Sequence, residues 1–425
     1  MDRVQRVRTS SYDVFRMNRT RLEAPALLIA LLGFLVPILG CAGGATGRPP
    51  VVAASPPSGS ARPEPPAPTP IPAPAPAPPA LPSGPLPGMP PVLDPDDIYS
   101  ETRPGHLSPV VKGFPERVYV PNSKSNTVDV IDPRTFKIID HFDVGLLPQH
   151  VTPSWDLRTL WVLNNVGNTV TKIDPATGKK GGSVRVDAPY NMYYTPDGKY
   201  AMVVAERLRR LDFRDPHTMK LQRSLSVPCP GVDHVDFSAD GRYLIASCEF
   251  GARMIKVDVA EQRFLGSVKL RPGAMPQDVK LSPDGKVFYV ADMRSNGVYM
   301  IDGERPSVVG FIPTGLGAHG LYASRDSKVL YVSNRGEGTI SLIDFETRAV
   351  VKKWVLPGGG SPDMGGVSED GKVLWLAGRY HSEVYAIDTK DGKLLARIPV
   401  GREPHGLCIY PQPGRYSLGH TGVFR

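Results

Sequence analysis

The chain has 425 residues, with 46 prolines, 43 glycines, 4 cysteines and a formal charge of +8. Twenty of the prolines fall between residues 49 and 95, a density that removes backbone donors and excludes a folded domain there. The globular part therefore lies within about residues 96–425, which suffices for one large all-β domain. Residues 1–41 carry six Lys/Arg and three Asp/Glu, so the rest of the chain has a charge of +5 and no basic run. This balance argues against a nucleic-acid partner.

The N-terminal segment, residues 1–41, has the features of an export signal. Several arginines precede an apolar run from Ala24 to Gly40, which is shorter than the ~20 residues that a membrane-spanning helix needs. The run ends in Ile38-Leu39-Gly40-Cys41, which resembles a bacterial lipoprotein signal with Cys41 as the lipidated residue. A plain secretory signal or an uncleaved anchor is the alternative. Each of these interpretations has the protein exported and close to the membrane. The preferred one places it in the cell envelope, exported and membrane-anchored, in the periplasm or at the cell surface.

Residues 42–98 are predicted to be a disordered tether rich in proline and alanine. Alternating Ala-Pro between Pro63 and Pro79 favours an extended polyproline II conformation. Such a segment holds the folded domain, residues 99–425, away from the membrane surface.

The folded part repeats one short pattern, an apolar residue followed by aspartate. The seven aspartates of this pattern are Asp132, Asp174, Asp212, Asp258, Asp302, Asp344 and Asp388. Their spacings run from 38 to 46 residues, which is the period of a β-propeller blade with four strands. We therefore predict an all-β, seven-bladed propeller. The aspartates are expected to accept backbone amides in the turn after the third strand of each blade, a structural role.

One repeat shows the four expected strands of a blade. They are residues 320–324, 329–333, 339–343 and 350–355, each rich in β-branched or aromatic residues and bounded by turn residues. The first unit starts at residue 117 with a second strand, whereas residues 405–410 form a first strand with no successor. Pairing of this C-terminal strand with the N-terminal blade closes the ring and removes an open sheet edge.

These repeats resemble a known family. The sequences of residues 331–334, 338–344 and 282–285 are similar to the bacterial YVTN-family, or YncE-like, β-propeller repeat, and the resemblance covers residues 117–410. The resemblance implies a propeller of the quinoprotein amine dehydrogenase-like kind. The same superfamily includes lactonase-like enzymes and oxidoreductases as well as proteins without known catalysis, so it does not define a function.

The loops that enter the first strand of each blade carry unusual polar residues, and these loops should surround one mouth of the central channel. Four of the nine histidines fall there. The candidate ligand-binding residues are His150, Asn191, Asp233, His234, Asp278, His319, Asp363 and His405, joined by Arg294, Arg335 and Arg379 from loops on the same face.

Two kinds of ligand suit this set. Imidazole and carboxylate groups suit a divalent metal, with His150, His234, His319 and His405 as its candidate ligands. The arginines suit a small anionic ligand, unless they pair with Glu337, Glu383 or the backbone. The alternative is an ordinary hydrated propeller mouth. No cofactor is firmly implied, and the absence of a Cys-x-x-Cys-His motif argues against covalent c-type haem.

The remaining cysteines fit an oxidising compartment. Cys229 and Cys248 are expected near the same mouth, where a disulfide between them is plausible, and Cys408 is expected to be a buried thiol.

The preferred function is a ligand-binding, protein-binding or scaffold module rather than an enzyme, acting as a monomer. A metal- or cofactor-dependent enzyme that uses the same face is the first alternative. A structural protein of the cell surface is the second. A tail, residues 411–425, is extra to the repeats, and the sequence gives it no role.

Overall fold

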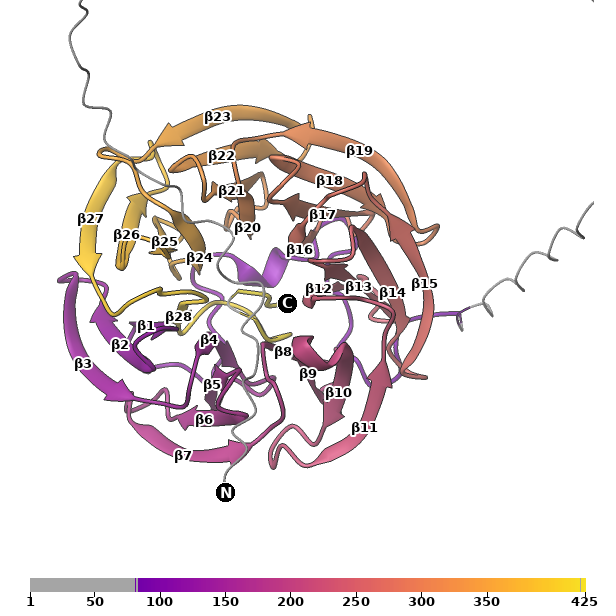
Figure 1. The fold of residues 1–425 in the computed structure, drawn as a ribbon, viewed down its shortest axis with the longest axis horizontal. Helices are drawn as coiled ribbons and strands as arrows, with labels where there is room; N and C mark the ends of the chain where they lie inside the picture. The colour runs from indigo at the N-terminus through magenta and orange to yellow at the C-terminus, as the bar shows by residue number, and fades with distance from the viewer. Residues whose placement is uncertain (1–80, 82, 421) are drawn as a thin grey trace, which may run out of the picture. The chain divides into compact units, whose positions relative to one another are not determined.

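The computed structural model describes residues 81, 83–420 and 422–425. Within these residues, 28 strands form seven four-stranded antiparallel sheets arranged as blades around a central axis (Figure 1). The predicted all-β, seven-bladed propeller is therefore confirmed. The predicted signal segment and most of the predicted tether lie outside the described residues.

The blades follow one another along the chain, and in blades 2 to 7 the chain runs from the innermost to the outermost strand. Blade 1 contains β28 (Cys408–Tyr410), β1 (Arg117–Asn122), β2 (Thr127–Asp132) and β3 (Lys137–Asp143). Blade 2 contains β4 (Pro148–Pro153), β5 (Leu160–Asn164), β6 (Thr169–Ile173) and β7 (Lys180–Arg185). Blade 3 contains β8 (Asn191–Tyr194), β9 (Ala201–Ala205), β10 (Arg210–Arg214) and β11 (Leu221–Ser226).

The other four blades have the same order. Blade 4 contains β12 (Val232–Phe237), β13 (Tyr243–Cys248), β14 (Arg253–Asp258) and β15 (Arg263–Lys269). Blade 5 contains β16 (Pro276–Leu281), β17 (Val287–Asp292), β18 (Gly297–Asp302) and β19 (Ser307–Pro313). Blade 6 contains β20 (Ala318–Ala323), β21 (Val329–Asn334), β22 (Thr339–Asp344) and β23 (Ala349–Val355). Blade 7 contains β24 (Pro362–Val367), β25 (Val373–Gly378), β26 (Glu383–Asp388) and β27 (Leu394–Pro399).

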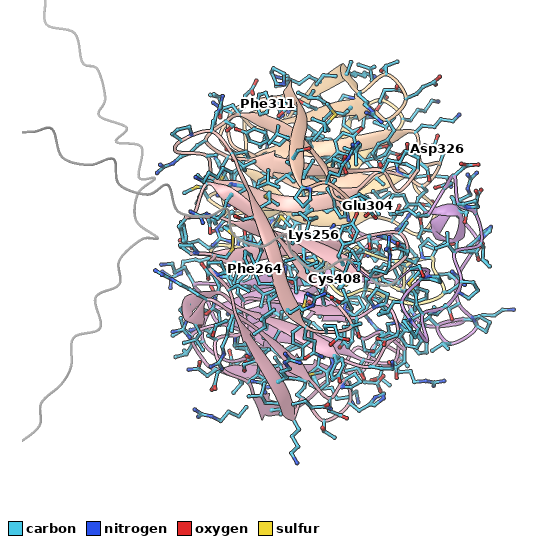
Figure 2. The ribbon with its side chains drawn as sticks, turned by 90° about the vertical axis from the view of Figure 1, so that its right-hand side faces the viewer. Lys256, Phe264, Glu304, Phe311, Asp326 and Cys408 are labelled. Atoms are coloured by element: carbon cyan, nitrogen blue, oxygen red, sulfur yellow. A yellow bond between two sulfur atoms is a disulfide. The ribbon has the colours of Figure 1, made fainter. Side chains whose placement is uncertain are left out.

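Burial decreases from the axis to the rim. Innermost strands such as β16 are buried at every position, whereas outermost strands such as β11 are mostly exposed. Apolar side chains of neighbouring blades pack between the sheets, as where Val287 and Tyr289 of blade 5 share a cluster with Leu321 of blade 6. Polar bonds also join blades: Lys256 Nζ donates to the carbonyl oxygens of Gly303 (2.7 Å) and Glu304 (3.1 Å) in the next blade (Figure 2).

The ring is closed by the C-terminal strand, as predicted. β28 pairs antiparallel with β1, with Tyr410 opposite Arg117 and Cys408 opposite Tyr119. Blade 1 thus takes its innermost strand from one end of the repeat array and its other three strands from the other end. The closed ring leaves no blade without an innermost strand.

The asparagine that ends the second strand ties it to the third. In blade 6, Asn334 Nδ2 donates to Thr339 Oγ1 and Ser341 Oγ, each at 3.0 Å. Asn122 and Asn164 make equivalent bonds in blades 1 and 2. This contact explains why, in these three blades, the asparagine at the end of the second strand is followed five residues later by a threonine.

One of the seven predicted turn aspartates was misaligned. Asp174 of blade 2 accepts the Ala176 amide, as expected, but in blade 3 the equivalent residue is Asp215, which accepts the amides of His217 and Thr218. Asp212 instead lies inside β10 and pairs with Arg214. With Asp215 in place, the spacings narrow to 41–44 residues.

Residues 83–116 run across one face of the ring, which we call the lower face. The turns from innermost to second strands lie there, and three of them bind this segment: Leu86 N donates to Asp240 O, Ile98 N to Pro283 O, and Gly105 N to Glu369 Oε1. Leu86 and Ile98 are buried. The packed part of the chain therefore begins before residue 99, inside the segment predicted as tether.

A disulfide joins Cys229, which precedes β12, to Cys248 at the end of β13, with 5.1 Å between their Cα atoms. Cys408 is a buried free thiol. Among the described residues, no helix has the length and apolar character needed to cross a membrane.

We expect the disulfide to contribute to stability, because it closes a loop with a sequence separation of 19 residues. Replacing both Cys229 and Cys248 by serine should lower the free energy of unfolding by about 2–4 kcal/mol. Urea unfolding followed by tryptophan fluorescence measures this change, and a reductant should then have no further effect on the double variant. An unchanged midpoint for the reduced wild type would contradict the expectation.

Candidate functional site

The polar residues at the axis occupy an irregularity of the innermost strands. In five blades, the pairing of the innermost strand with the second strand skips two residues. The skipped pairs are Gln149 and His150, Asp233 and His234, Gln277 and Asp278, His319 and Gly320, and Asp363 and Met364. These positions were expected in loops at an open mouth, but they lie within buried strands. All of their side chains are buried.

Two of these residues, His319 and Asp363, belong to the upper tier, which we define as His319, Asp363 and His405 with Arg335 and Arg379. His319 Nδ1 lies 2.9 Å from Asp363 Oδ1, and His405 Nδ1 lies 2.9 Å from Asp363 Oδ2. The Arg335 Nη1 atom lies 3.1 Å from Oδ1 of the same carboxylate, and Arg379 Nη1 lies 3.7 Å from Oδ2. Four side chains from three blades thus converge on one buried aspartate.

The charges of the upper tier follow from burial and pairing. Burial lowers the pKa of His319 to about 4 and that of His405 to about 3. Burial would raise the pKa of Asp363, but the facing His319 and Arg335 hold it well below its usual range. Asp363 is therefore ionised, and the two neutral histidines donate their Nδ1 protons to it.

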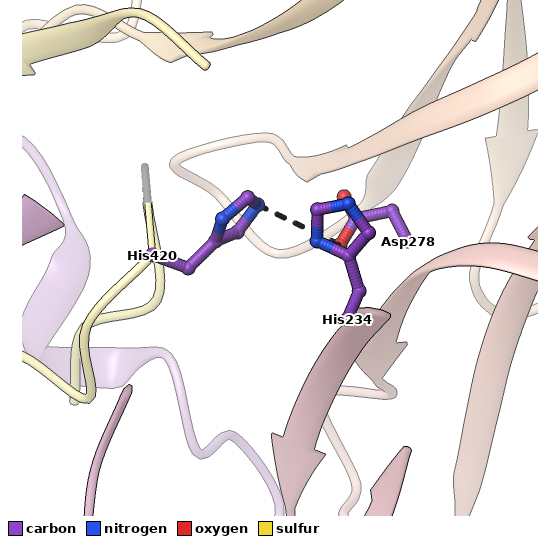
Figure 3. Close-up of side chains that lie close together, drawn as sticks. All are labelled: His234, Asp278 and His420. Carbon is purple, nitrogen blue, oxygen red and sulfur yellow. Dashed lines mark ion pairs between the residues drawn. The ribbon is translucent and has the colours of Figure 1, made fainter. Parts of the chain in front are cut away.

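Below it lies the lower tier, defined as His150, Asn191, His234, Asp278 and His420. The Nδ1 atoms of His234 and His420 each lie 3.1 Å from Asn191 Nδ2. Asp278 Oδ1 lies 3.9 Å from His234 Nδ1 and 3.7 Å from His420 Nε2 (Figure 3). The His150 ring completes the group, with its centroid 5.4 Å from that of His234 and 5.1 Å from that of His420.

His420 belongs to the tail and was not among the predicted site residues. The tail enters the channel from the lower face, where Tyr194 N donates to Leu418 O and His420 N to Met192 O. A buried ion pair between Arg425 and Asp236 holds its far end (2.9 Å). No repeat pattern marks these residues; the one usable signal is the apolar character of Tyr416, Leu418, Val423 and Phe424.

The lower tier combines ionised and neutral groups. Burial and the neighbouring histidines lower the pKa of His150, His234 and His420 well below 6.5. Burial raises the pKa of Asp278 to about 6, although Lys280 opposes this shift. At neutral pH the rings offer lone pairs, and Asp278 is mostly ionised.

A glycine makes room for His150. The backbone of His150 forms a β-bridge with that of Gly406, and a Cβ atom on Gly406 would lie 1.9 Å from His150 Nδ1. A side chain at residue 406 would therefore exclude the imidazole from the axis.

Two predicted features differ from the structure: the place of Arg294 and the partners of Arg335 and Arg379. Arg294 is exposed and outside both tiers. Arg335 and Arg379 contact Asp363, whereas Glu337 and Glu383, their expected partners, pair with Lys353 and Arg397. Asp233 is buried beside His234, with 3.4 Å between Oδ1 and Nε2, and burial beside Glu249 raises its pKa well above the usual range.

Comparison with solved structures shows the same fold in proteins of several kinds. The periplasmic gluconolactonase PpgL of Pseudomonas aeruginosa is 20% identical, with a TM-score of 0.59 over 70% of this chain and 99% of that one. Hydrazine synthase of Kuenenia stuttgartiensis is also 20% identical, with a TM-score of 0.57 over 68% of this chain and 95% of that one. Such identities show the fold alone.

The sequence comparisons identify the family. An uncharacterised YncE protein of Salmonella typhi is 24% identical over 279 residues, which are 60% of this chain and 75% of that protein. The model of the YNCE-like beta-propeller family matches residues 107–414, which include all seven blades. The chain therefore belongs to the YncE-like β-propeller family.

Proposed function

We propose that this protein is an exported binding module that holds a small anionic ligand at the upper tier. The observation that carries the proposal is the state of Arg379. Its side chain is only 10% exposed, and its Nη1 atom makes no hydrogen bond to any described residue. A buried cationic donor without an acceptor costs about 1–3 kcal/mol or more, which a bound carboxylate or phosphate would offset.

The neighbouring histidines suit the same ligand. Because His319 and His405 donate Nδ1–H to Asp363, their Nε2 atoms are acceptors for hydroxyl groups of a ligand. His405 Nε2 already lies 3.4 Å from the Tyr190 hydroxyl. A hydroxylated organic anion thus combines the groups that this tier recognises.

Turnover is the main alternative, because a histidine oriented by a buried aspartate is also a general base. The gluconolactonase with the same fold makes a sugar lactone the first substrate to test. We favour binding, because the Nδ1 protons of His319 and His405 are held by Asp363, whereas the unused Arg379 donor suits an anion.

Thermal unfolding tests the ligand site with phosphate, citrate and gluconate as probes. A probe that binds the folded protein at 100 times its Kd stabilises it by about 2.7 kcal/mol. At least one probe should raise the Tm of the wild type and of Arg294→Gln, the exposed arginine control, but not that of Arg379→Gln. Equal shifts in all three proteins, or none in the wild type, would refute the site. If the wild type hydrolyses gluconolactone and His405→Gln does not, the proposed function is catalysis and not binding alone.

We also propose that the protein is lipid-anchored at Cys41 in the cell envelope. The proposal rests on the Leu39-Gly40-Cys41 sequence after an apolar run and on the Cys229–Cys248 disulfide, which suits an oxidising compartment.

Replacing Cys41 by serine should release the anchor, because the thiol that carries the lipid is lost. We expect the wild type to remain in the membrane fraction after a high-salt wash. In intact-protein mass spectrometry, Cys41→Ser should lack the mass of the attached lipid. Cys408→Ser, which alters a buried thiol of the propeller, is the control and should keep its lipid. Identical lipid-free masses for the wild type and Cys41→Ser would refute the anchor.

A further inference from the structure

We propose that the lower tier is a binding site for a first-row divalent transition metal such as Zn²⁺, with His234, Asp278 and His420 as ligands and His150 as the fourth. This site lies beneath the proposed anion site and does not depend on it. The propeller supplies three of these residues, and the tail supplies His420.

The ligand atoms are already close to a coordination geometry. One atom from each of His234, Asp278 and His420 lies within 4.8 Å of the others. Asp278 Oδ1 is 3.9 Å from His234 Nδ1 and 3.7 Å from His420 Nε2. Zinc bonds of about 2.0–2.2 Å in a tetrahedron place ligand atoms roughly 3.4 Å apart. The two pairs that include Asp278 therefore need to close by only a few tenths of an ångström, and the two imidazoles must also approach each other from within 4.8 Å.

His150 adds an observation that points to a ligand. It is completely buried, yet neither ring nitrogen has a hydrogen-bond partner among the described residues. Its ring lies against those of both His234 and His420. A buried imidazole without hydrogen-bond partners is costly, and a shared cation would satisfy it. The His150 ring is not among the groups that lie within 4.8 Å of one another, so it must move toward the ion to become the fourth ligand.

The residues around the ligands support the required protonation states. With Nδ1 of His234 as the ligand atom, its Nε2 faces Asp233 Oδ1 at 3.4 Å, and neither atom has a hydrogen-bond partner among the described residues. A small closure of this contact would let the Asp233 carboxyl group accept the Nε2–H and fix the ligand ring. Asp278 is held by the amides of Val279 (2.9 Å) and Leu321 (2.8 Å).

Asn191 must change its role when the metal binds. Its Oδ1 accepts the Met192 amide, so its Nδ2 faces the Nδ1 atoms of His234 and His420. Ligation through His420 Nε2 leaves the His420 proton on Nδ1. Asn191 must then turn its amide so that its oxygen accepts that proton and its Nδ2 no longer donates to His234 Nδ1, and it gives up the bond from the Met192 amide.

The chemistry of the ligands selects the metal. Imidazole nitrogens combined with one carboxylate suit Zn²⁺, Fe²⁺, Co²⁺ or Ni²⁺, whereas Mg²⁺ and Ca²⁺ prefer an all-oxygen shell. The four groups come from β4, β12, β16 and the tail, so the ion would also clamp the tail to three blades.

Metal binding to the full-length protein tests the proposal. After removal of metals with EDTA, Zn²⁺ is titrated by calorimetry, and bound zinc is counted by mass spectrometry after gel filtration. We expect one Zn²⁺ per chain in the wild type, and affinity lower by about tenfold or more in His420→Gln and Asp278→Asn. The variant His217→Gln, which changes an exposed turn histidine, and Arg379→Gln of the upper tier should bind zinc as the wild type does.

Two results would overturn the site: no stoichiometric Zn²⁺ in the wild type, or unchanged affinity in His420→Gln. Circular dichroism shows whether each variant is folded. If Asp278→Asn fails to fold, His420→Gln alone decides, because it leaves every blade residue unchanged. The visible absorption of bound Co²⁺ reports independently on nitrogen and oxygen ligands, and it should be lost in His420→Gln. Retention of zinc in Arg379→Gln without any anion binding separates this site from the proposed function.

Discussion

The pairing of β28 with β1 is the contact on which the rest of the structure depends. This strand of three residues completes blade 1, so it closes the ring. His405, just before β28, contacts Asp363 of the upper tier, and the tail just after it carries His420 into the lower tier. A single short strand therefore links ring closure to both tiers, and loosening it would disturb both.

The side chains at the axis are polar although they are buried, and the two tiers provide partners for these polar groups in different ways. In the upper tier, the charge of Asp363 is balanced by Arg335 and Arg379 and by hydrogen bonds from two neutral histidines. The lower tier has an ionised Asp278 among neutral rings. Lys280, on the same strand, is the cation that lowers the pKa of Asp278. Unpaired lone pairs on His150 remain there. A divalent cation would satisfy these groups, which is why we assign the metal to the lower tier and the anion to the upper one.

The repeats predicted the blade number, the strand order and the closure, because turn chemistry and strand alternation recur in every blade. They failed at Asp212, where β10 carries an aspartate three residues before the true turn residue, Asp215. The polar residues at the axis could be predicted because they depart from the repeat. Their burial could not be predicted, because the two-residue irregularity in the innermost strands leaves no sequence signal. His420 was missed because the tail makes contacts that only the folded ring creates.

The central claim is that the channel holds one metal ion between the blades and the tail. Anomalous diffraction at the zinc absorption edge, from crystals grown with Zn²⁺, tests it most directly. The account predicts one strong peak at the axis, within about 2.0–2.2 Å of His234 Nδ1, His420 Nε2 and Asp278 Oδ1. A channel without a peak, or zinc bound only at surface histidines such as His217, would contradict it.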